Sequence, residues 1–151
     1  MMTKLHYYSP GIAGLLIGLI VGYETSASLG LPRFMTYALV PLLTAIDLGL
    51  TCQLGVLGFQ GLFAGVLPVP IGKTLRGTMC HLIGFLIVLG LLTRVGLSLA
   101  GSQFGVFTLI SELGAGVVLV WALIGLGSLL LALLLYVFSI PSAIADFPRD
   151  D

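Results

Sequence analysis

The chain has 151 residues, of which 58% are hydrophobic and 8% are charged, and its six basic and six acidic side chains give zero net charge. Soluble domains carry about 25% charged residues, so this composition excludes a water-soluble fold. The lack of a basic surplus excludes a nucleic-acid-binding protein, and the high hydrophobicity excludes a disordered chain. The composition therefore predicts an all-α integral membrane protein surrounded by membrane lipids.

We predict four transmembrane helices, since a bilayer core about 30 Å thick needs about 20 apolar residues of helix. The spans of this single membrane domain, residues 1–151, are predicted at residues 7–23, 34–58, 77–93 and 113–140. Residues 24–33 and 98–111 are predicted to be connections, because both contain serine and glycine. The fourth span is the clearest, with no charge between Glu112 and Asp146 and with Pro141 as a natural stop.

The second apolar region, residues 34–67, is too long for one straight helix and too short for two helices and a turn. Because Pro41 lies inside it, we expect one kinked helix as far as residue 58. A short re-entrant or interfacial segment would follow up to Leu67, and protein must cover it because lipid offers no hydrogen bonds. If the region folds as two pieces instead, the count rises to five spans.

Basic residues near the span ends predict the orientation in the membrane. With four spans, both termini lie on one side together with the loop that contains Lys73 and Arg76. Lys4 and Arg149 add to that side, whereas the opposite side has only two basic residues, Arg33 and Arg94. The bias predicts that both termini are cytoplasmic, or lie in an equivalent compartment such as a stroma.

Glycine is unusually frequent, with 21 residues, and in the first span Gly14, Gly18 and Gly22 recur every fourth residue. This glycine-zipper row lies on one helix face, where the lack of side chains lets another backbone approach closely. The row predicts close helix packing, either within the chain or with another membrane protein subunit. It also favours a retained helix over the cleavable secretory signal that Lys4 and the following apolar run imitate.

Other residues also predict helix packing. In the fourth span Gly125, Ser128 and Ala132 form a strip of small residues, and leucine and valine make the rest bulky. The bulky side suits lipid or a partner equally, because lipid tails are as apolar as leucine. Gln53 and Gln60 share a face if their helix continues that far, and buried amides form hydrogen bonds between membrane helices.

Asp47 is the sharpest candidate for a functional polar residue. It falls near the middle of the second span, where a charged aspartate costs about 2.5–3.5 kcal/mol on insertion scales. Thr44 and Thr51, three residues before it and four after it, share its helix face. Three interpretations stay open: a proton or cation site, a neutral or paired aspartate that fixes helix packing, and an interfacial residue at a helix boundary. Arg94 is the most plausible counter-ion.

His81 is a candidate ligand of a haem iron or a chlorophyll magnesium, although the sequence requires no cofactor. His6 would lie near the same membrane face, so a bis-histidine haem is geometrically allowed. Cys52 and Cys80 match no metal or redox spacing and are predicted to be small buried hydrophobes.

The sequence contains no H-E-x-x-H, phosphate-binding-loop or G-x-S-x-G motif, and no carboxylates paired for acid–base work within the spans. We therefore expect no enzyme, but a non-catalytic accessory or assembly subunit of a larger membrane complex. Two alternatives remain: a small transporter or channel with a proton or cation site at Asp47, and a cofactor-bearing subunit that uses His81.

Overall fold

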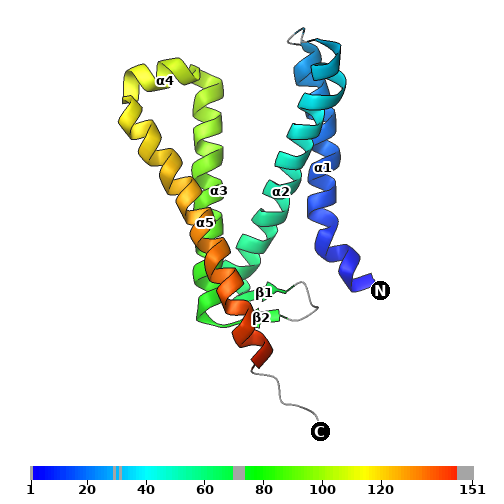
Figure 1. Ribbon diagram of the computed structural model, residues 1–151, viewed down its shortest axis with the longest axis vertical. Coiled ribbons are helices and arrows are strands. Elements are labelled where there is room, and N and C mark those ends of the chain that lie inside the picture. Colours follow the sequence, from blue (N-terminus) through cyan, green and yellow to red (C-terminus); the bar gives the residue numbers. More distant parts are fainter. Residues whose placement is uncertain (1, 29, 31, 70–73, 146–151) are drawn as a thin grey trace. The chain divides into compact units, whose positions relative to one another are not determined.

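A computed structural model describes the chain except residues 1, 29, 31, 70–73 and 146–151 (Figure 1). Its elements in chain order are α1 (Met2–Ser28), the π-helix η1 (Met35–Leu39), α2 (Val40–Phe59), the π-helix η2 (Gln60–Ala64), β1 (Val66–Pro68), β2 (Thr74–Arg76), α3 (Thr78–Phe104), α4 (Val106–Leu113) and α5 (Ala115–Ala145). The contacts divide the chain into two compact units, Met1–Val56 and Leu57–Asp151, which are described separately. That the chain is a single membrane domain stays a prediction.

Four helices are long and apolar enough to cross a membrane: Tyr8–Ser28, Met35–Ala64, Thr78–Ala100 and Ala115–Pro141. The predicted helical fold class with four spans is therefore confirmed, and the region after Arg33 forms one span rather than two. The start of the loop predicted at residues 24–33 is wrong, because α1 continues to Ser28. The polar side chains there fit a helix because they donate hydrogen bonds to its own carbonyl groups, as Thr25 does to Val21 at 2.7 Å.

The connection predicted at residues 98–111 does join the third and fourth spans, which end at Ala100 and begin at Ala115, but most of it is helical. Helix α3 continues to Phe104, and α4 follows as a separate eight-residue helix. Two glycines with positive φ, Gly105 (76°) and Gly114 (82°), turn the chain at its two ends. Figure 1 shows α4 lying across the ends of α3 and α5. Its apolar residues recur at helical spacing and its polar ones lie between them, which is typical of a helix in the membrane interface.

The second span is irregular at both ends. Before Pro41 the backbone N–H of Val40 bonds to the carbonyl of Met35, five residues back. Proline causes this wide turn because it has no N–H and its ring crowds the carbonyl four residues earlier. The predicted helix end at residue 58 is too early, because the helix continues through η2 to Ala64. The non-helical segment that follows it is strand β1.

In the first unit, the glycine row of α1 lies directly on α2. A Cβ atom on Gly14 would lie 2.6 Å from the carbonyl oxygen of Leu48, and one on Gly18 would lie 2.6 Å from that of Thr44. A Cβ atom on Gly22 would meet the backbone of α2 at a similar distance. Backbone atoms cannot move aside as a flexible side chain can, so this face has no room for a larger residue. Within the described residues, α2 of the same chain therefore occupies the row.

Hydrogen bonds hold α1 to α2 at one end of the glycine row and to η1 at the other. The backbone N–H of Gly11 donates to the side-chain oxygen of Gln53 at 3.2 Å. The fully buried hydroxyl of Ser26 donates to the carbonyl of Thr36 at 3.1 Å. The amide of Gln53 thus makes the interhelical hydrogen bond that its position predicts.

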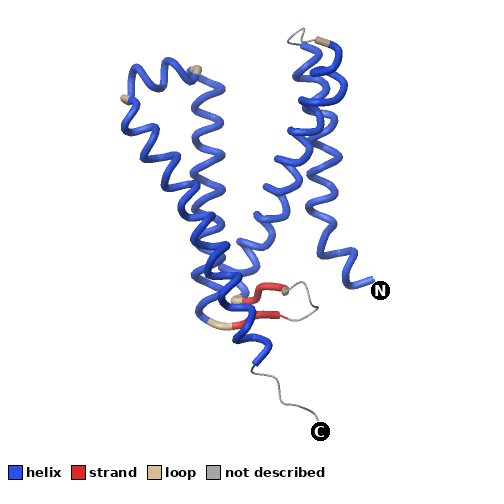
Figure 2. The backbone as a smooth tube through the Cα atoms, in the orientation of Figure 1, coloured by secondary structure: helices blue, strands red, loops and turns tan. Residues whose placement is uncertain are grey.

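In the second unit, strands β1 and β2 form an antiparallel hairpin beside the ends of α3 and α5 (Figure 2). Leu67 of β1 is buried together with Cys80 and Ile83 of α3, and they form a small apolar core. The hydroxyl of Tyr136 on α5 donates to the carbonyl of Pro68 at 2.6 Å. The hairpin and the residues around it therefore cover the non-helical backbone, as the sequence requires.

Helices α3 and α5 pack through small residues. Gly125, Ser128 and Ala132 are buried, as expected for the flat strip of the fourth span. A Cβ atom on Gly90 would lie 2.8 Å from the hydroxyl oxygen of Ser128, and one on Gly125 would lie 3.2 Å from the Cβ atom of Thr93. The two helices can approach this closely because each offers glycine where the other is bulkier.

Glycine packing in the first unit can be tested with Gly18→Leu. We expect the free energy of unfolding in mild detergent to fall by about 1–3 kcal/mol, since the new side chain would overlap the backbone of α2. Thermal unfolding followed by circular dichroism measures this. Gly127→Leu is the matched control, because a Cβ atom at Gly127 meets nothing within 4 Å. Equal melting midpoints for the two variants would contradict the packing.

Candidate functional site

Asp47 lies near the middle of the 30-residue span Met35–Ala64, and its side chain is exposed in the first unit. Helix α2 is continuous through this position, so no helix boundary lies there. The hydroxyl of Thr44 donates to the carbonyl of Val40 at 2.8 Å, and that of Thr51 donates to the backbone carbonyl of Asp47 at 2.8 Å. Both threonines therefore hydrogen-bond to their own helix.

Thr44, Asp47 and Thr51, the residues of the predicted proton or cation site, differ in what surrounds their side chains. A Cβ atom on Gly22 would lie 2.9 Å from the Thr44 hydroxyl, so Thr44 is directed at α1, whereas Asp47 is exposed. A proton or cation site at Asp47 stays a prediction. The pairing of Asp47 with Arg94 also stays a prediction, because the two residues belong to different units.

His81 lies in the first turn of α3, and its side chain contacts the end of η2. Its Nδ1 atom is 2.7 Å from the backbone carbonyl oxygen of Leu62. A carbonyl oxygen only accepts, so Nδ1 carries the proton and Nε2 is left without one in the neutral ring. A Cβ atom on Gly65 would lie 2.5 Å from Nε2, so glycine at that position makes room for the imidazole.

This geometry gives His81 a structural role that the sequence did not reveal. The last carbonyl groups of a helix lack partners within the helix, and the imidazole serves one of them. The only signal for this role in the sequence is Gly65, which follows η2 and lies sixteen residues before His81. A glycine there does not reveal which side chain will lie against it. Ligation of a haem or chlorophyll stays a prediction, and the side chain of His6 lies outside the described residues.

The cysteines are both free thiols, with Cys80 buried under the hairpin and Cys52 partly buried beside Gly14. Among the residues that the structure describes, no three His, Cys, Asp or Glu side chains gather as a metal site would require.

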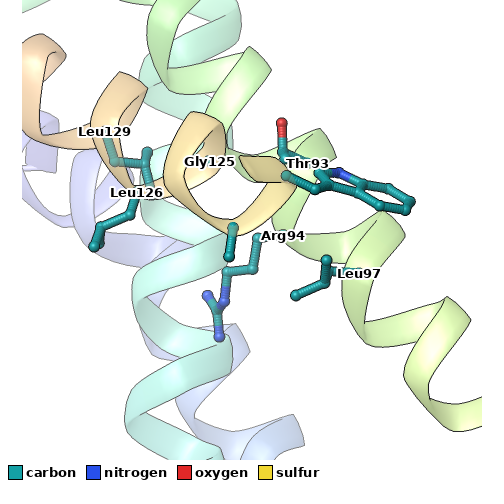
Figure 3. A pocket seen from close by; sticks show the side chains of 8 residues that line it. Thr93, Arg94, Leu97, Gly125, Leu126 and Leu129 are labelled. Atoms are coloured by element: carbon teal, nitrogen blue, oxygen red, sulfur yellow. The ribbon is translucent and has the colours of Figure 1, made fainter. Parts of the chain in front are cut away.

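A groove of about 220 Å³ lies between α3 and α5 in the second unit (Figure 3). Its lining residues come from both helices: Thr93, Arg94, Leu97, Trp121, Ala122, Gly125, Leu126 and Leu129. Apart from Arg94 the lining is almost entirely apolar, because the hydroxyl of Thr93 is bound to the carbonyl of Leu89 at 2.6 Å.

Sequence reasoning missed this groove, because its two walls are more than twenty residues apart in the chain. Gly96 and Gly125 are the signal that was available, since glycine opposite a large side chain leaves space. A Cβ atom on Gly96 would lie 3.0 Å from the ring of Trp121, so the indole rests on α3 at a position without a side chain.

Long apolar helices with largely exposed leucine and phenylalanine side chains make this chain an integral, multi-pass membrane protein in contact with lipid. Phe63 and Phe138, for example, are 74% and 75% exposed. Comparison of the chain with protein-family models, curated proteins and solved structures finds no match.

The role of His81 can be tested with His81→Ala. We expect the free energy of unfolding to fall by about 1 kcal/mol, because the carbonyl of Leu62 loses its donor. Met79→Ala is the control, since it removes an exposed side chain from the same turn.

The absorption spectrum of the same samples tests ligation. A band between about 400 and 700 nm that is lost in His81→Ala would support a bound haem or chlorophyll.

For the stability experiment, an unchanged melting midpoint in His81→Ala would contradict the structural role of His81.

Proposed function

We propose that the chain is a non-catalytic accessory or assembly subunit of a larger membrane complex, and that it docks to its partner through α5. The observation that carries this proposal is the placement of Gly116 and Gly127. Among the residues that the structure describes, a Cβ atom on either glycine meets nothing within 4 Å. The two are eleven residues apart, which is three helical turns, so they share one face of α5.

These two glycines differ from those that hold the helices of the chain together. Gly18, Gly84 and Gly90 each lie against a neighbouring helix of the same unit. Helices in lipid gain no hydrophobic free energy by associating, so small residues that allow close approach are a main source of affinity. Gly116 and Gly127 offer the same kind of surface with no neighbour in the described part of the chain, which suits a helix of another subunit.

Large exposed side chains lie beside this glycine face on α5. Leu123, Leu134 and Phe138 are 57%, 53% and 75% exposed, and they fall on the same side of the helix as Gly127. A partner helix could therefore place its own small residues over these side chains and its larger ones over the glycines. Such mutual filling gives the dispersion contacts on which membrane helix pairs depend.

A non-catalytic role is part of the same proposal. Several hydroxyl groups inside the spans donate to carbonyl groups of their own helices at 2.6–2.9 Å, namely those of Thr44, Thr93, Ser128 and Ser139. Hydroxyls bound in this way contribute to helix structure rather than to a substrate site.

The orientation belongs to the proposal as well. Four spans place both termini on the same side of the membrane, and the distribution of basic residues favours the cytoplasmic side or its equivalent.

The docking face can be tested with Gly127→Leu. We expect this variant to lose the proteins that co-purify with the unmutated chain in mild detergent, while its own melting midpoint is unchanged, because its side chain enters open space. Native gel electrophoresis and mass spectrometry of the purified complex measure the loss. Ala115→Leu is the control, since it adds bulk at an exposed position of α5 on a different face. If Gly127→Leu retains every co-purifying protein, docking through this face of α5 is wrong.

A second candidate function is a transporter or channel centred on Asp47. The exposure of this side chain near the middle of a continuous span favours it, because ionisable residues at that depth commonly mark ion pathways.

Flux measurements separate the two functions. An accessory subunit should show no proton or cation flux when reconstituted alone in vesicles. Flux that disappears in Asp47→Asn but persists in Glu24→Gln, a matched change of an exposed carboxylate near the end of α1, would instead establish transport.

A further inference from the structure

The two glutamines of the second span differ in whether the chain satisfies their amides. Gln53 is partly buried, and its side-chain oxygen accepts from the backbone N–H of Gly11 at 3.2 Å. Gln60 lies in η2 with its side chain exposed, and its amide forms no hydrogen bond within the part of the chain that the structure describes. An amide in hydrocarbon without a hydrogen-bond partner is costly. The partner of the Gln60 amide must therefore come from another molecule.

The position of Gln60 along its span makes lipid headgroups a poor partner. It lies four residues before Ala64, the end of the span, which at 1.5 Å per residue is about 6 Å into the apolar segment. The Cα–Cβ bonds of a helix are tilted toward its N-terminus. Because Gln60 is near the C-terminal end of its span, its side chain leaves the backbone toward the middle of the bilayer and away from the nearer headgroups. The partner group must therefore belong to another segment within the membrane.

The side chains around Gln60 form a surface that another helix can approach. Phe59, Gln60, Phe63 and Ala64 are all exposed, and we call them the Gln60 face. Gly61, between them in the sequence, is buried, and a Cβ atom there would lie 2.8 Å from the backbone of α3. The two phenylalanine rings stack with their centroids 5.9 Å apart and an interplanar angle of 8°. Ala64 follows the amide by about one turn, and its small side chain lets a second helix come close.

A second copy of this chain supplies what the amide lacks. A glutamine side chain has both N–H donors and an acceptor oxygen, so two glutamines can form two reciprocal hydrogen bonds. Two copies inserted in the same direction can be related by a two-fold axis along the membrane normal, which places equivalent residues at the same depth. Gln60 of one copy then meets Gln60 of the other without any further polar residue being required at that depth.

We propose that the Gln60 face is a self-association surface, at which the Gln60 amides of two copies donate to and accept from each other. The phenylalanine rings and the surrounding lipid keep water away from these hydrogen bonds, which strengthens them. The Gln60 face includes no residue of α5, whereas the proposed docking face centres on Gly127. Self-association therefore goes beyond the proposed function and does not depend on it.

Energy transfer between donor-labelled and acceptor-labelled copies of the purified chain measures this association. The copies are reconstituted in phosphatidylcholine vesicles over a range of protein-to-lipid ratios, with no other protein present. We expect dimers, and we expect Gln60→Leu to weaken them about eightfold, the factor that two interhelical hydrogen bonds of average strength provide. Gln60→Asn should retain part of the affinity. Gly127→Leu should leave the dimer intact, which separates this test from that of the docking face.

Disulfide cross-linking locates the contact between the two copies. In a chain that carries Cys52→Ala and Cys80→Ala, Ala64→Cys introduces a single thiol one turn from the amide. We expect a mild oxidant to link two such copies, and we expect Gln60→Leu in the same chain to reduce the linked fraction. Leu92→Cys is the matched control, because Leu92 is 65% exposed on α3 and lies outside the Gln60 face.

Three results would overturn the proposal. A chain that stays monomeric at every protein-to-lipid ratio would leave the Gln60 amide to a helix of a different subunit. Equal association of Gln60→Leu and the unmutated chain, with circular dichroism showing that the variant is folded, would place the contact elsewhere. Cross-linking of Leu92→Cys as efficient as that of Ala64→Cys would show that the copies meet without a defined interface.

Discussion

Backbone contact at glycine is the interaction on which this structure depends. In lipid, no hydrophobic free energy draws one apolar helix toward another, so association relies on close packing. Gly18 lies on the backbone of α2, and Gly84 lies on the backbone that leads into Leu62. At such distances dispersion forces and weak Cα–H hydrogen bonds act between main chains. Alanine at either position would place its Cβ atom too close to the neighbouring backbone, so the two helices would have to move apart.

The second constraint is that the few polar side chains serve the backbone. Gln53 accepts from the N–H of Gly11, His81 donates to the carbonyl of Leu62, and the hydroxyl of Tyr136 donates to that of Pro68. The contacts of His81 and Tyr136 lie where regular helical hydrogen bonding ends, at η2 and at the hairpin. Unsatisfied backbone groups cost several kcal/mol in a membrane, so these two side chains make the end of the π-helix and the hairpin tolerable there.

Helix α5 presents two different surfaces, one of which it forms together with α3. The face around Gly127 is shallow and flanked by bulky side chains, which suits another helix. The groove beside Trp121 is formed together with α3, and its lining is almost entirely apolar apart from Arg94. A single helix can present both because its faces differ in the size of their side chains and in their distance from a charge.

The sequence by itself determined the number of spans, the irregular turn before Pro41 and the close packing of the first helix, because these depend on local hydropathy and on spacing along one helix. It did not determine where α1 and α3 end, since serine and threonine can satisfy their hydroxyl groups within a helix as well as in a loop. Only the tertiary structure decided that His81 serves a helix end and that Arg94 borders a groove. Those contacts join segments far apart in the chain, and no periodicity within a single helix specifies which residues will meet.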